Sequence, residues 1–289
     1  GCTPDDNCIV IPIHNHNNEL VGTAKRKLNG TPKSINSRNN EFFTKSATLF
    51  NLNNCYKQIK DRVYCVEGFF DALAGTNYGI PTVGYCGIEL HKDQIKLLGG
   101  YLQDNTIITI IPDNEPKAFT RLNAMRQKIY EVIPNATVEV GFFPQKDVHD
   151  LSEFWQQGHG IETIIYKNID LFCLEEKLIG CKSKSAEYSV VKRFITTVRN
   201  PMSKDEICTW LKSRWEISKK EVGEILSLTI NREENDIDNN TNSIFDELVA
   251  LYNSDTYSCG FPILDASIDS LRKTDVFIIG GYSGIKKTF

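Results

Sequence analysis

The length and composition of the chain indicate a globular protein with more than one domain. Its 289 residues exceed the usual size of a single hydrophobic core, and about 150 residues per domain predicts at least two domains. Hydrophobic residues make up 40%, and no apolar run approaches the roughly 20 residues that span a bilayer, which excludes a membrane protein. The nine cysteines are an odd number without a CxxC pair, so we expect reduced thiols and a cytoplasmic location.

The net charge of -4 conceals a basic segment near the N-terminus. Between His16 and Lys60, eight basic residues accompany only two acidic ones. Charge alone leaves two alternatives open, a solvated basic surface or a surface that binds nucleic-acid phosphates. Short β-rich runs at 8–13 and 20–25, joined by a polar segment, predict a hairpin. We therefore expect an antiparallel, basic N-terminal lobe over residues 1–60.

Strands and helices alternate from residue 62 onward. The expected order is strand 63–66, helix 69–78, strand 81–84, helix 91–102, strand 106–111, helix 116–132, strand 136–142 and helix 150–157. Strands that alternate with helices of this length form βαβ units in a mainly parallel sheet. We therefore expect a Rossmann-like α/β lobe over residues 61–165.

The rest of the sequence divides into three parts. Apolar residues at helical spacing predict a helical module over residues 166–230. The polar run NREENDIDNNTN at 231–242 has almost nothing to bury and is typical of a linker. Residues 243–289 end in a buried strand and a glycine-rich turn, which predicts the start of a further domain in a longer protein. The predicted fold class is therefore multidomain, α/β combined with α+β.

Acidic residues follow three of the predicted strands. Glu67 comes after the first strand, Asp113 and Glu115 after the third, and Asp147 and Asp150 after the fourth. Because parallel strands end at the same edge of a sheet, these carboxylates should meet there and repel one another unless a cation lies between them. Each carboxylate taken alone could equally be a helix cap. Together they predict a site for Mg²⁺ or Mn²⁺, which prefer hard oxygen ligands.

Three acidic motifs resemble the Toprim domain of DnaG-type DNA primases. They are VEGFFDAL at 66–73, PDNEP at 112–116 and KDVHDL at 146–151. The stretch GIELHKDQIKLL at 87–98 is similar to the segment that joins the first two acidic motifs in these primases. The resemblance implies a Toprim-type lobe that uses divalent metal ions.

The basic segment extends this resemblance to about residues 8–160. VIPIHNHNNELVGTAKRKL at 10–28, PKSINS at 32–37 and FTK at 43–45 are similar to the N-terminal motifs of these primases. The matched positions imply binding of nucleic acid and NTPs by five residues: Arg26, Lys33, Asn36, Arg38 and Lys45.

The resemblance also implies a role for each acidic residue. Glu67 matches a catalytic and metal-binding glutamate, Asp113 and Glu115 match the catalytic metal-binding pair, and Asp147 matches a further metal ligand. The chain departs from the pattern at Glu115, where these primases carry Asp. We expect Asp71 to cap the turn at Glu67 instead of binding metal.

The C-terminal segment resembles the beginning of the RecA-like domain of DnaB-type replicative helicases. The similarity runs from GFPILD at 260–265 to the final glycine-rich turn. That turn is a degenerate P-loop, with Gly281, Lys287 and Thr288 in place but Lys286 where a glycine is required, so we expect no ATPase activity. The resemblance implies a fused, hexameric replicative helicase in a phage- or plasmid-type primase-helicase.

Taken together, the motifs predict a DNA primase catalytic core. It would synthesise short RNA primers from NTPs on a single-stranded DNA template during replication, in the bacterial or phage-infected cytoplasm, at the nucleoid. Two alternatives stay open from the sequence. One is a Toprim nuclease that cleaves DNA with the same metals, and the other is a non-catalytic scaffold that binds DNA or a helicase.

Overall fold

In the computed structural model, three stretches of the chain are described: residues 8–28, 34–218 and 220–223. The chain divides into two compact units, the first made of Gly1–Glu176 and Thr197–Val222, the second of Lys177–Thr196 and Gly223–Phe289. Both predicted lobes therefore fall in the first unit. Several predicted features lie outside the described residues: Lys33, the linker at 231–242, the helicase-like segment at 243–289, and within it Gly281, Lys287 and Thr288.

The N-terminal part is an antiparallel sheet, as predicted. β1 (Cys8–His14) pairs with β2 (Leu20–Lys27), which also pairs with β3 (Ser34–Asn36), a strand too short to be recognised from the sequence. Asn15 closes the hairpin turn, since its Oδ1 accepts hydrogen bonds from the backbone of Asn17 and Glu19, both at 3.0 Å. Cys8 is disulfide-bonded, so the prediction of reduced thiols is wrong at that position. The other described cysteines form no disulfide.

A five-stranded sheet forms the centre of the first unit. Its strands are β4 (Arg62–Val66), β5 (Thr82–Gly84), β6 (Ile107–Ile111), β7 (Thr137–Phe142) and β8 (Ile165–Asn168). The spatial order is β5-β4-β6-β7-β8, with the first four strands parallel and β8 antiparallel to β7. The mainly parallel sheet is confirmed. The sequence predicts that the helical module starts at residue 166, but residues 165–168 instead form an edge strand that pairs with β7.

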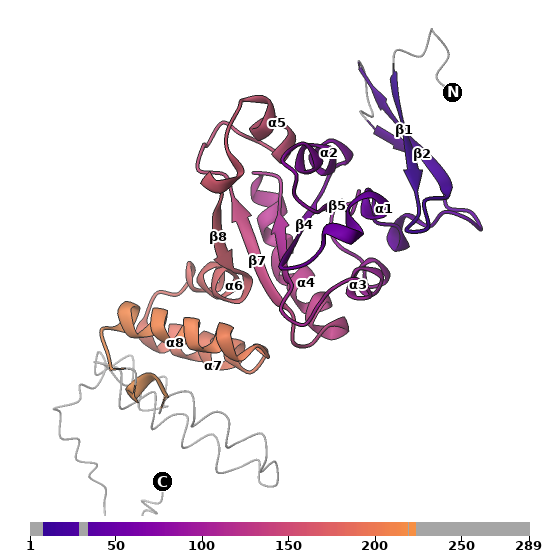
Figure 1. The fold of residues 1–289 in the computed structure, drawn as a ribbon. Coiled ribbons are helices and arrows are strands. Elements are labelled where there is room, and N and C mark those ends of the chain that lie inside the picture. Colours follow the sequence, from indigo (N-terminus) through magenta and orange to yellow (C-terminus); the bar gives the residue numbers. More distant parts are fainter. Residues whose placement is uncertain (1–7, 29–33, 219, 224–289) are drawn as a thin grey trace, which may run out of the picture. The chain divides into compact units, whose positions relative to one another are not determined.

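Helices cover both faces of this sheet. The helices of six or more residues in the described part of the first unit are α2 (Phe69–Asn77), α3 (Lys92–Gly99), α4 (Pro116–Val132), α5 (Leu151–Gln156), α6 (Ile169–Leu178) and α8 (Pro201–Trp215). α2 packs with α5, and α3 packs with α4 (Figure 1). α7 (Lys184–Ile195) belongs to the second unit. Short helical turns complete the described elements: η1 (Lys45–Ala47), α1 (Leu52–Cys55), η2 (Tyr56–Gln58) and η3 (Ile161–Thr163).

The strand order creates a crevice at one edge of the sheet. From β4 the chain crosses to β5 on one side, and then returns to β6 on the other side of β4. Right-handed crossovers therefore place α2 on one face and α3 with α4 on the other. Open α/β sheets bind ligands at such a reversal, outside the carboxyl ends of the strands. Val66 and Ile111 are paired at these ends, so the residues that follow them begin side by side.

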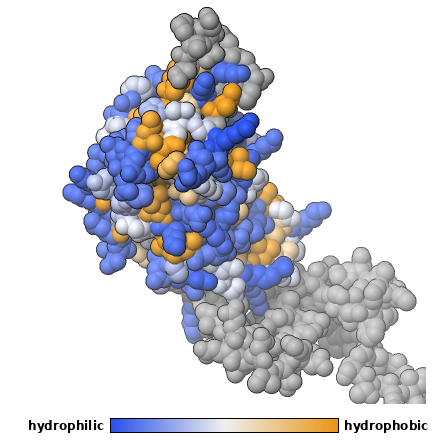
Figure 2. Space-filling model, turned by 90° about the vertical axis from the view of Figure 1, so that its right-hand side faces the viewer, coloured by the Kyte–Doolittle hydropathy of each residue, from blue (hydrophilic) through white to orange (hydrophobic). Residues whose placement is uncertain are grey.

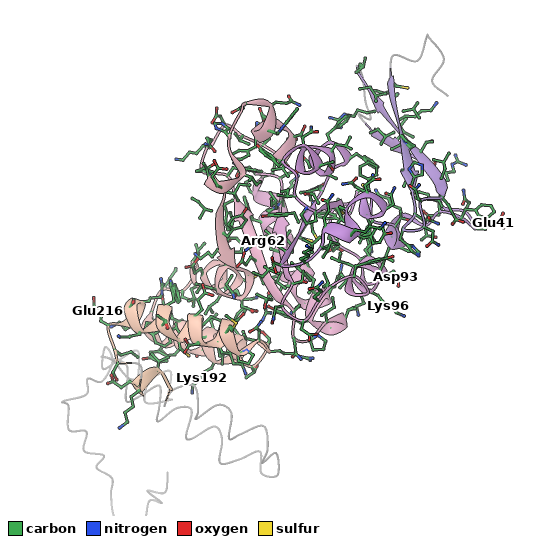
Figure 3. All side chains as sticks on the ribbon, viewed as in Figure 1. Glu41, Arg62, Asp93, Lys96, Lys192 and Glu216 are labelled. Atoms are coloured by element: carbon green, nitrogen blue, oxygen red, sulfur yellow. The ribbon has the colours of Figure 1, made fainter. Side chains whose placement is uncertain are left out.

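Polar contacts organise the interior of the first unit. Arg62 Nη1 in β4 contacts Thr109 Oγ1 in β6 and Glu139 Oε2 in β7, each at 2.5 Å (Figure 3). Arg126 in α4 forms a fully buried ion pair with Asp170 at the start of α6. Tyr130 donates a 2.7 Å hydrogen bond to the same carboxylate, which joins α4 to α6.

The described surface is mainly polar. On the face drawn in Figure 2, hydrophobic side chains form separate small areas within a hydrophilic surface. None of the helices in the described stretches combines the length and the apolar character that a bilayer crossing demands.

Candidate active site

Carboxylates from several strand ends line one pocket at the crevice. The pocket has a volume of about 320 Å³. Glu67 follows β4, Asp113 follows β6, Asp71 lies in the first turn of α2, and Asp150 immediately precedes α5. Of the predicted acidic residues, the fold therefore brings Glu67, Asp113 and Asp150 to one pocket.

The turn after Glu67 is shaped by Gly68 and Asp71. Asp71 Oδ2 accepts the backbone N–H of Gly68 at 3.1 Å, which caps the start of α2. A Cβ on Gly68 would lie 2.3 Å from this oxygen, so a larger residue here would displace the Asp71 carboxylate. Asp71 Oδ1 accepts the N–H of Ser152 in α5 at 3.0 Å. Asp71 thus caps the turn as predicted and also ties it to α5.

The remaining acidic residues differ in their placement. Asp150 lines the pocket and caps α5, because its Oδ1 accepts the N–H of Glu153 at 2.7 Å. Asp147 is exposed and does not line the pocket. Glu115 is exposed at the N-cap of α4, and it is close enough to Glu67 and Asp113 to raise the pKa of both carboxyl groups. In the sequence, nothing distinguished Asp147 from Asp150 except the motif match.

Mutual repulsion perturbs the carboxylates of the pocket. Burial, reinforced by Glu67, Asp71, Asp150 and Glu115, raises the pKa of Asp113 to about 7. Burial and the neighbouring Asp150 raise the pKa of Asp71 to about 6. Each carboxylate thus disfavours ionisation of the next, as expected where several acids share a site.

Cations partly offset this repulsion at Glu67. Burial raises the pKa of Glu67, and Glu115 adds to the effect, whereas the positive charges of Arg121 and Lys45 oppose it. Glu67 therefore lies between acidic neighbours and basic ones, at the boundary of the two charge types.

The donor set suits a hard divalent cation in its chemistry. Partly buried carboxylates that raise one another's pKa gain most from a positive ion placed among them. In the described parts of the chain, no three acidic, histidine or cysteine side chains already converge as a metal site. The carboxylates therefore fit Mg²⁺ or Mn²⁺ by charge and ligand type.

Basic residues of the N-terminal sheet face the same carboxylates. Lys25 and Arg26 of β2 line the acidic pocket from its other side. The Arg26 guanidinium lies 6.0 Å from the ring centre of Phe70 in α2, which is within cation–π distance. Arg26 of the basic N-terminal lobe thus lies across the pocket from the acidic sheet edge, which is the arrangement that the sequence predicts.

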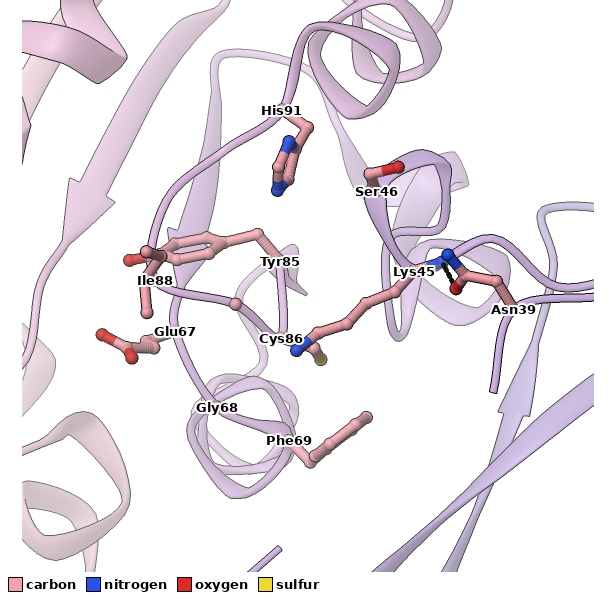
Figure 4. Close-up of a pocket in the computed structure, with 11 residues that line it drawn as sticks. Asn39, Lys45, Ser46, Glu67, Gly68, Phe69, Tyr85, Cys86, Ile88 and His91 are labelled. Atoms are coloured by element: carbon pink, nitrogen blue, oxygen red, sulfur yellow. Dashed lines mark hydrogen bonds between the residues drawn. The ribbon is translucent and has the colours of Figure 1, made fainter. Parts of the chain in front are cut away.

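A second cavity adjoins the first at Glu67. Its volume is about 500 Å³, and its lining includes Lys45, Tyr85 and His91 as well as Glu67 (Figure 4). The Lys45 side chain extends across the cavity toward Cys86 (Figure 4). Asn39 Oδ1 accepts the backbone N–H of Lys45 at 3.1 Å and so holds the loop that carries this lysine.

Gln94 joins the Lys45 segment to the sheet edge, a role that its sequence motif did not reveal. It is fully buried in α3, and its Nε2 lies 3.2 Å from the carbonyl of Lys45, 2.8 Å from that of Thr48 and 3.0 Å from that of Tyr85. Its Oε1 accepts the N–H of His91 at 3.0 Å. In the sequence, the signals were its place in the stretch GIELHKDQIKLL at 87–98 and its position beside the apolar Ile95.

Of the predicted nucleic-acid residues, one lies away from these cavities, and the side chains of two others are not described. Arg38 is exposed and lines neither cavity. The side chains of Lys33 and Asn36 lie outside the described residues, although the backbone of Asn36 pairs with Ala24 in the N-terminal sheet.

Comparison with known sequences gives consistent matches. Residues 6–56 match the family described as DNA primase catalytic core, N-terminal domain. The DNA primase of Thermotoga maritima is 33% identical over 164 residues, which are 55% of this chain and 28% of that protein. The DNA primase of Clostridium acetobutylicum is 23% identical over 247 residues, which are 80% of this chain and 40% of that protein. The chain therefore spans less than half the length of these curated relatives.

Solved structures share the fold. The DnaG primase catalytic domain bound to ssDNA has a TM-score of 0.60 and 19% identity, covering 74% of this chain and 71% of that one. The E. coli primase catalytic core has a TM-score of 0.57 and 20% identity, covering 75% of both chains. Over residues 6–56 the chain thus matches the family of DNA primase catalytic cores, and its fold is that of the DnaG catalytic domain.

Proposed function

We propose that the chain is the catalytic part of a DNA primase, which joins ribonucleoside triphosphates into an RNA primer on single-stranded DNA. One observation carries the proposal. Glu67, Asp113 and Asp150 share a pocket with Lys25 and Arg26 at the point where the strand order reverses. Similarity of the sequence to DNA primases supports this assignment over a nuclease with a similar acidic edge.

The acidic residues would hold the catalytic metal. We assign Glu67, Asp113 and Asp150 to Mg²⁺ or Mn²⁺, with Glu115 beside them; Asp150 takes the role predicted for Asp147. When bound, the metal would neutralise negative charge on the attacking 3′-oxygen and on the leaving pyrophosphate.

The basic residues would bind the phosphates of substrate and template. Lys45 reaches into the cavity of about 500 Å³ beside Glu67, where a triphosphate would find a point charge. Arg26 can give a phosphate two parallel hydrogen bonds while its plane remains near Phe70. We assign Lys33, Asn36 and Arg38 to the path of the template strand; of these, Arg38 lines neither cavity.

A replicative helicase is the partner that we propose. The support is the resemblance of residues 260–288 to the beginning of a RecA-like helicase domain. We infer a fused, hexameric helicase of phage or plasmid type, and a place of action at the bacterial nucleoid. Co-purification of the full-length protein as a hexamer would test this partnership.

Primer synthesis tests the catalytic assignment. The assay offers all four labelled NTPs and single-stranded DNA of mixed sequence, with Mg²⁺ or Mn²⁺, to the wild type and to Glu67→Gln. The matched control is Glu131→Gln, which removes an exposed carboxylate on α4 that pairs with Lys92 away from the pockets. We expect synthesis in the wild type and the control, and none in Glu67→Gln.

Other outcomes would replace the proposal. Cleavage of the DNA without formation of dinucleotides would identify a nuclease. Neither reaction, together with no calorimetric signal for Mn²⁺ binding, would identify a non-catalytic scaffold. Synthesis that persists in Glu67→Gln would refute the assignment of the active site.

A further inference from the structure

We propose that Asn114 is a positioning residue, which sets the distance between the carboxylates of Asp113 and Asp150 and thereby the affinity of the site for divalent cations. The inference rests on the proposed function, because it concerns the metal site of that reaction. Asn114 occupies the middle of the motif between Asp113 and Glu115 and is not itself expected to touch metal or substrate.

Asn114 holds two neighbouring carbonyls of another loop. Its backbone N–H donates to the carbonyl of His149 at 2.7 Å. Its side-chain Nδ2 donates to the carbonyl of Val148 at 3.0 Å. The loop after β6, which carries Asp113, is therefore fastened to the loop after β7, which carries Asp150.

The fastened loop has little freedom on its other side. The Val148 side chain is fully buried. Glu153 Oε2 accepts the N–H of His149 at 2.8 Å, and the N–H of Glu153 donates to Asp150 at 2.7 Å. These bonds shape the loop relative to α5. The two bonds from Asn114 fix this loop relative to Asp113.

The backbone itself does not require asparagine at this position. Asn114 is not among the residues with positive φ, the conformation that favours asparagine over most other residues. The turn is held by the N–H of Glu115, which donates to the carbonyl of Asp113 at 2.7 Å. Loss of the amide should therefore leave the turn intact and remove only one of the two links to the Asp150 loop.

Divalent cation binding is the property that this link should control. Two carboxylates that repel each other move apart when the loops that carry them are released, and a cation then has to draw them together again. Residues that orient metal ligands without touching the metal typically change affinity or activity by about 10- to 100-fold. We expect the lower end, about tenfold, because the backbone bond to His149 survives.

The experiment compares Asn114→Ala with a matched control. Asn200→Ala removes an amide that also donates to a backbone carbonyl, that of Ala136 at 3.3 Å, at the opposite end of β7. For each protein, calorimetry measures the affinity for Mn²⁺ alone, and a melting curve without metal measures folding. Asn114→Ala should bind Mn²⁺ about tenfold more weakly, while Asn200→Ala should bind it as the wild type does and lose more thermal stability.

A second variant and a second readout keep the test decisive. Asn114→Gly also lacks the amide and should show the same loss of Mn²⁺ affinity. In primer synthesis, the Mg²⁺ concentration at half-maximal rate should rise by a similar factor, with the rate restored at saturating Mg²⁺. Wild-type affinity for Mn²⁺ in both Asn114 variants would overturn the inference and leave the proposed function standing.

Failure of the proposed function has a different signature. A wild-type protein that binds Mn²⁺ but makes no primer would refute primase activity, and the calorimetric comparison of the Asn114 variants would still decide the positioning role. A wild-type protein that binds no Mn²⁺ would overturn both.

Discussion

Replacement of Asp113 by asparagine should stabilise the protein in the absence of metal while it abolishes primer synthesis. Burial and four neighbouring carboxylates raise the pKa of Asp113 from its usual 3.8 to about 7. The ionised carboxylate is therefore unfavourable in the folded protein and unperturbed in the unfolded chain. Asparagine keeps the shape of the side chain and removes the charge.

The sign and size of the effect follow from this shift. Below about pH 4 the carboxyl is protonated in both states, so it costs nothing. Between about pH 4 and pH 7 the unfolded chain loses its proton first, so the free energy of unfolding decreases as the pH rises. The full difference would be about 4 kcal/mol, but Asp113 is partly exposed and solvent screens its charge, so we expect a gain of about 1–2 kcal/mol in Asp113→Asn at pH 8.

Urea denaturation in the presence of EDTA, at pH 4 and at pH 8, measures this difference. Asp113→Asn should exceed the wild type in free energy of unfolding at pH 8 and match it at pH 4. Addition of Mg²⁺ at pH 8 should stabilise the wild type more than the variant, because the cation relieves the same repulsion. Equal stability of the two proteins at pH 8, or the same difference at both pH values, would show that the carboxylates do not repel one another in this pocket.

Two further substitutions test the contacts that position the site. Asp170→Ala should lower the free energy of unfolding by about 3–5 kcal/mol, because it leaves Arg126 buried without its partner. Urea denaturation measures this free energy, and a loss below about 1 kcal/mol would argue against a buried ion pair between Arg126 and Asp170. Gln94→Leu should lower the free energy of unfolding by about 2–3 kcal/mol and raise the KM for NTPs, because the carbonyls of Lys45 and Thr48 lose their donor. An unchanged KM would show that Gln94 does not affect NTP binding in the Lys45 cavity.

Local sequence patterns determined the main elements. Residues 63–66 of β4 are apolar and buried, and β6 is apolar except for Thr109, which is typical of parallel strands covered on both faces. Pro116 begins α4 at the residue expected from its fixed φ. The rule that sites lie beyond the carboxyl ends of strands was enough to bring Glu67 and Asp113 together. These features depend on residues close in sequence, so they can be read without the fold.

Other features depend on contacts between distant residues. β8 has four residues and becomes a strand only because β7 offers an edge for pairing. Gln94 serves the site only because α3 brings it against the Lys45 segment, and Asn114 only because the β6 and β7 loops adjoin.

The choice between Asp150 and Asp147 shows most clearly what the sequence by itself could not decide. The two residues lie three positions apart in one loop, and both are acidic residues after the same strand. Asp150 caps α5 and so faces the pocket, whereas Asp147 points to solvent. A sequence pattern determines that a carboxylate is available at a strand end. Packing of the neighbouring helix and loops decides which carboxylate reaches the site, because the direction of a side chain in a loop depends on contacts that the loop does not itself encode.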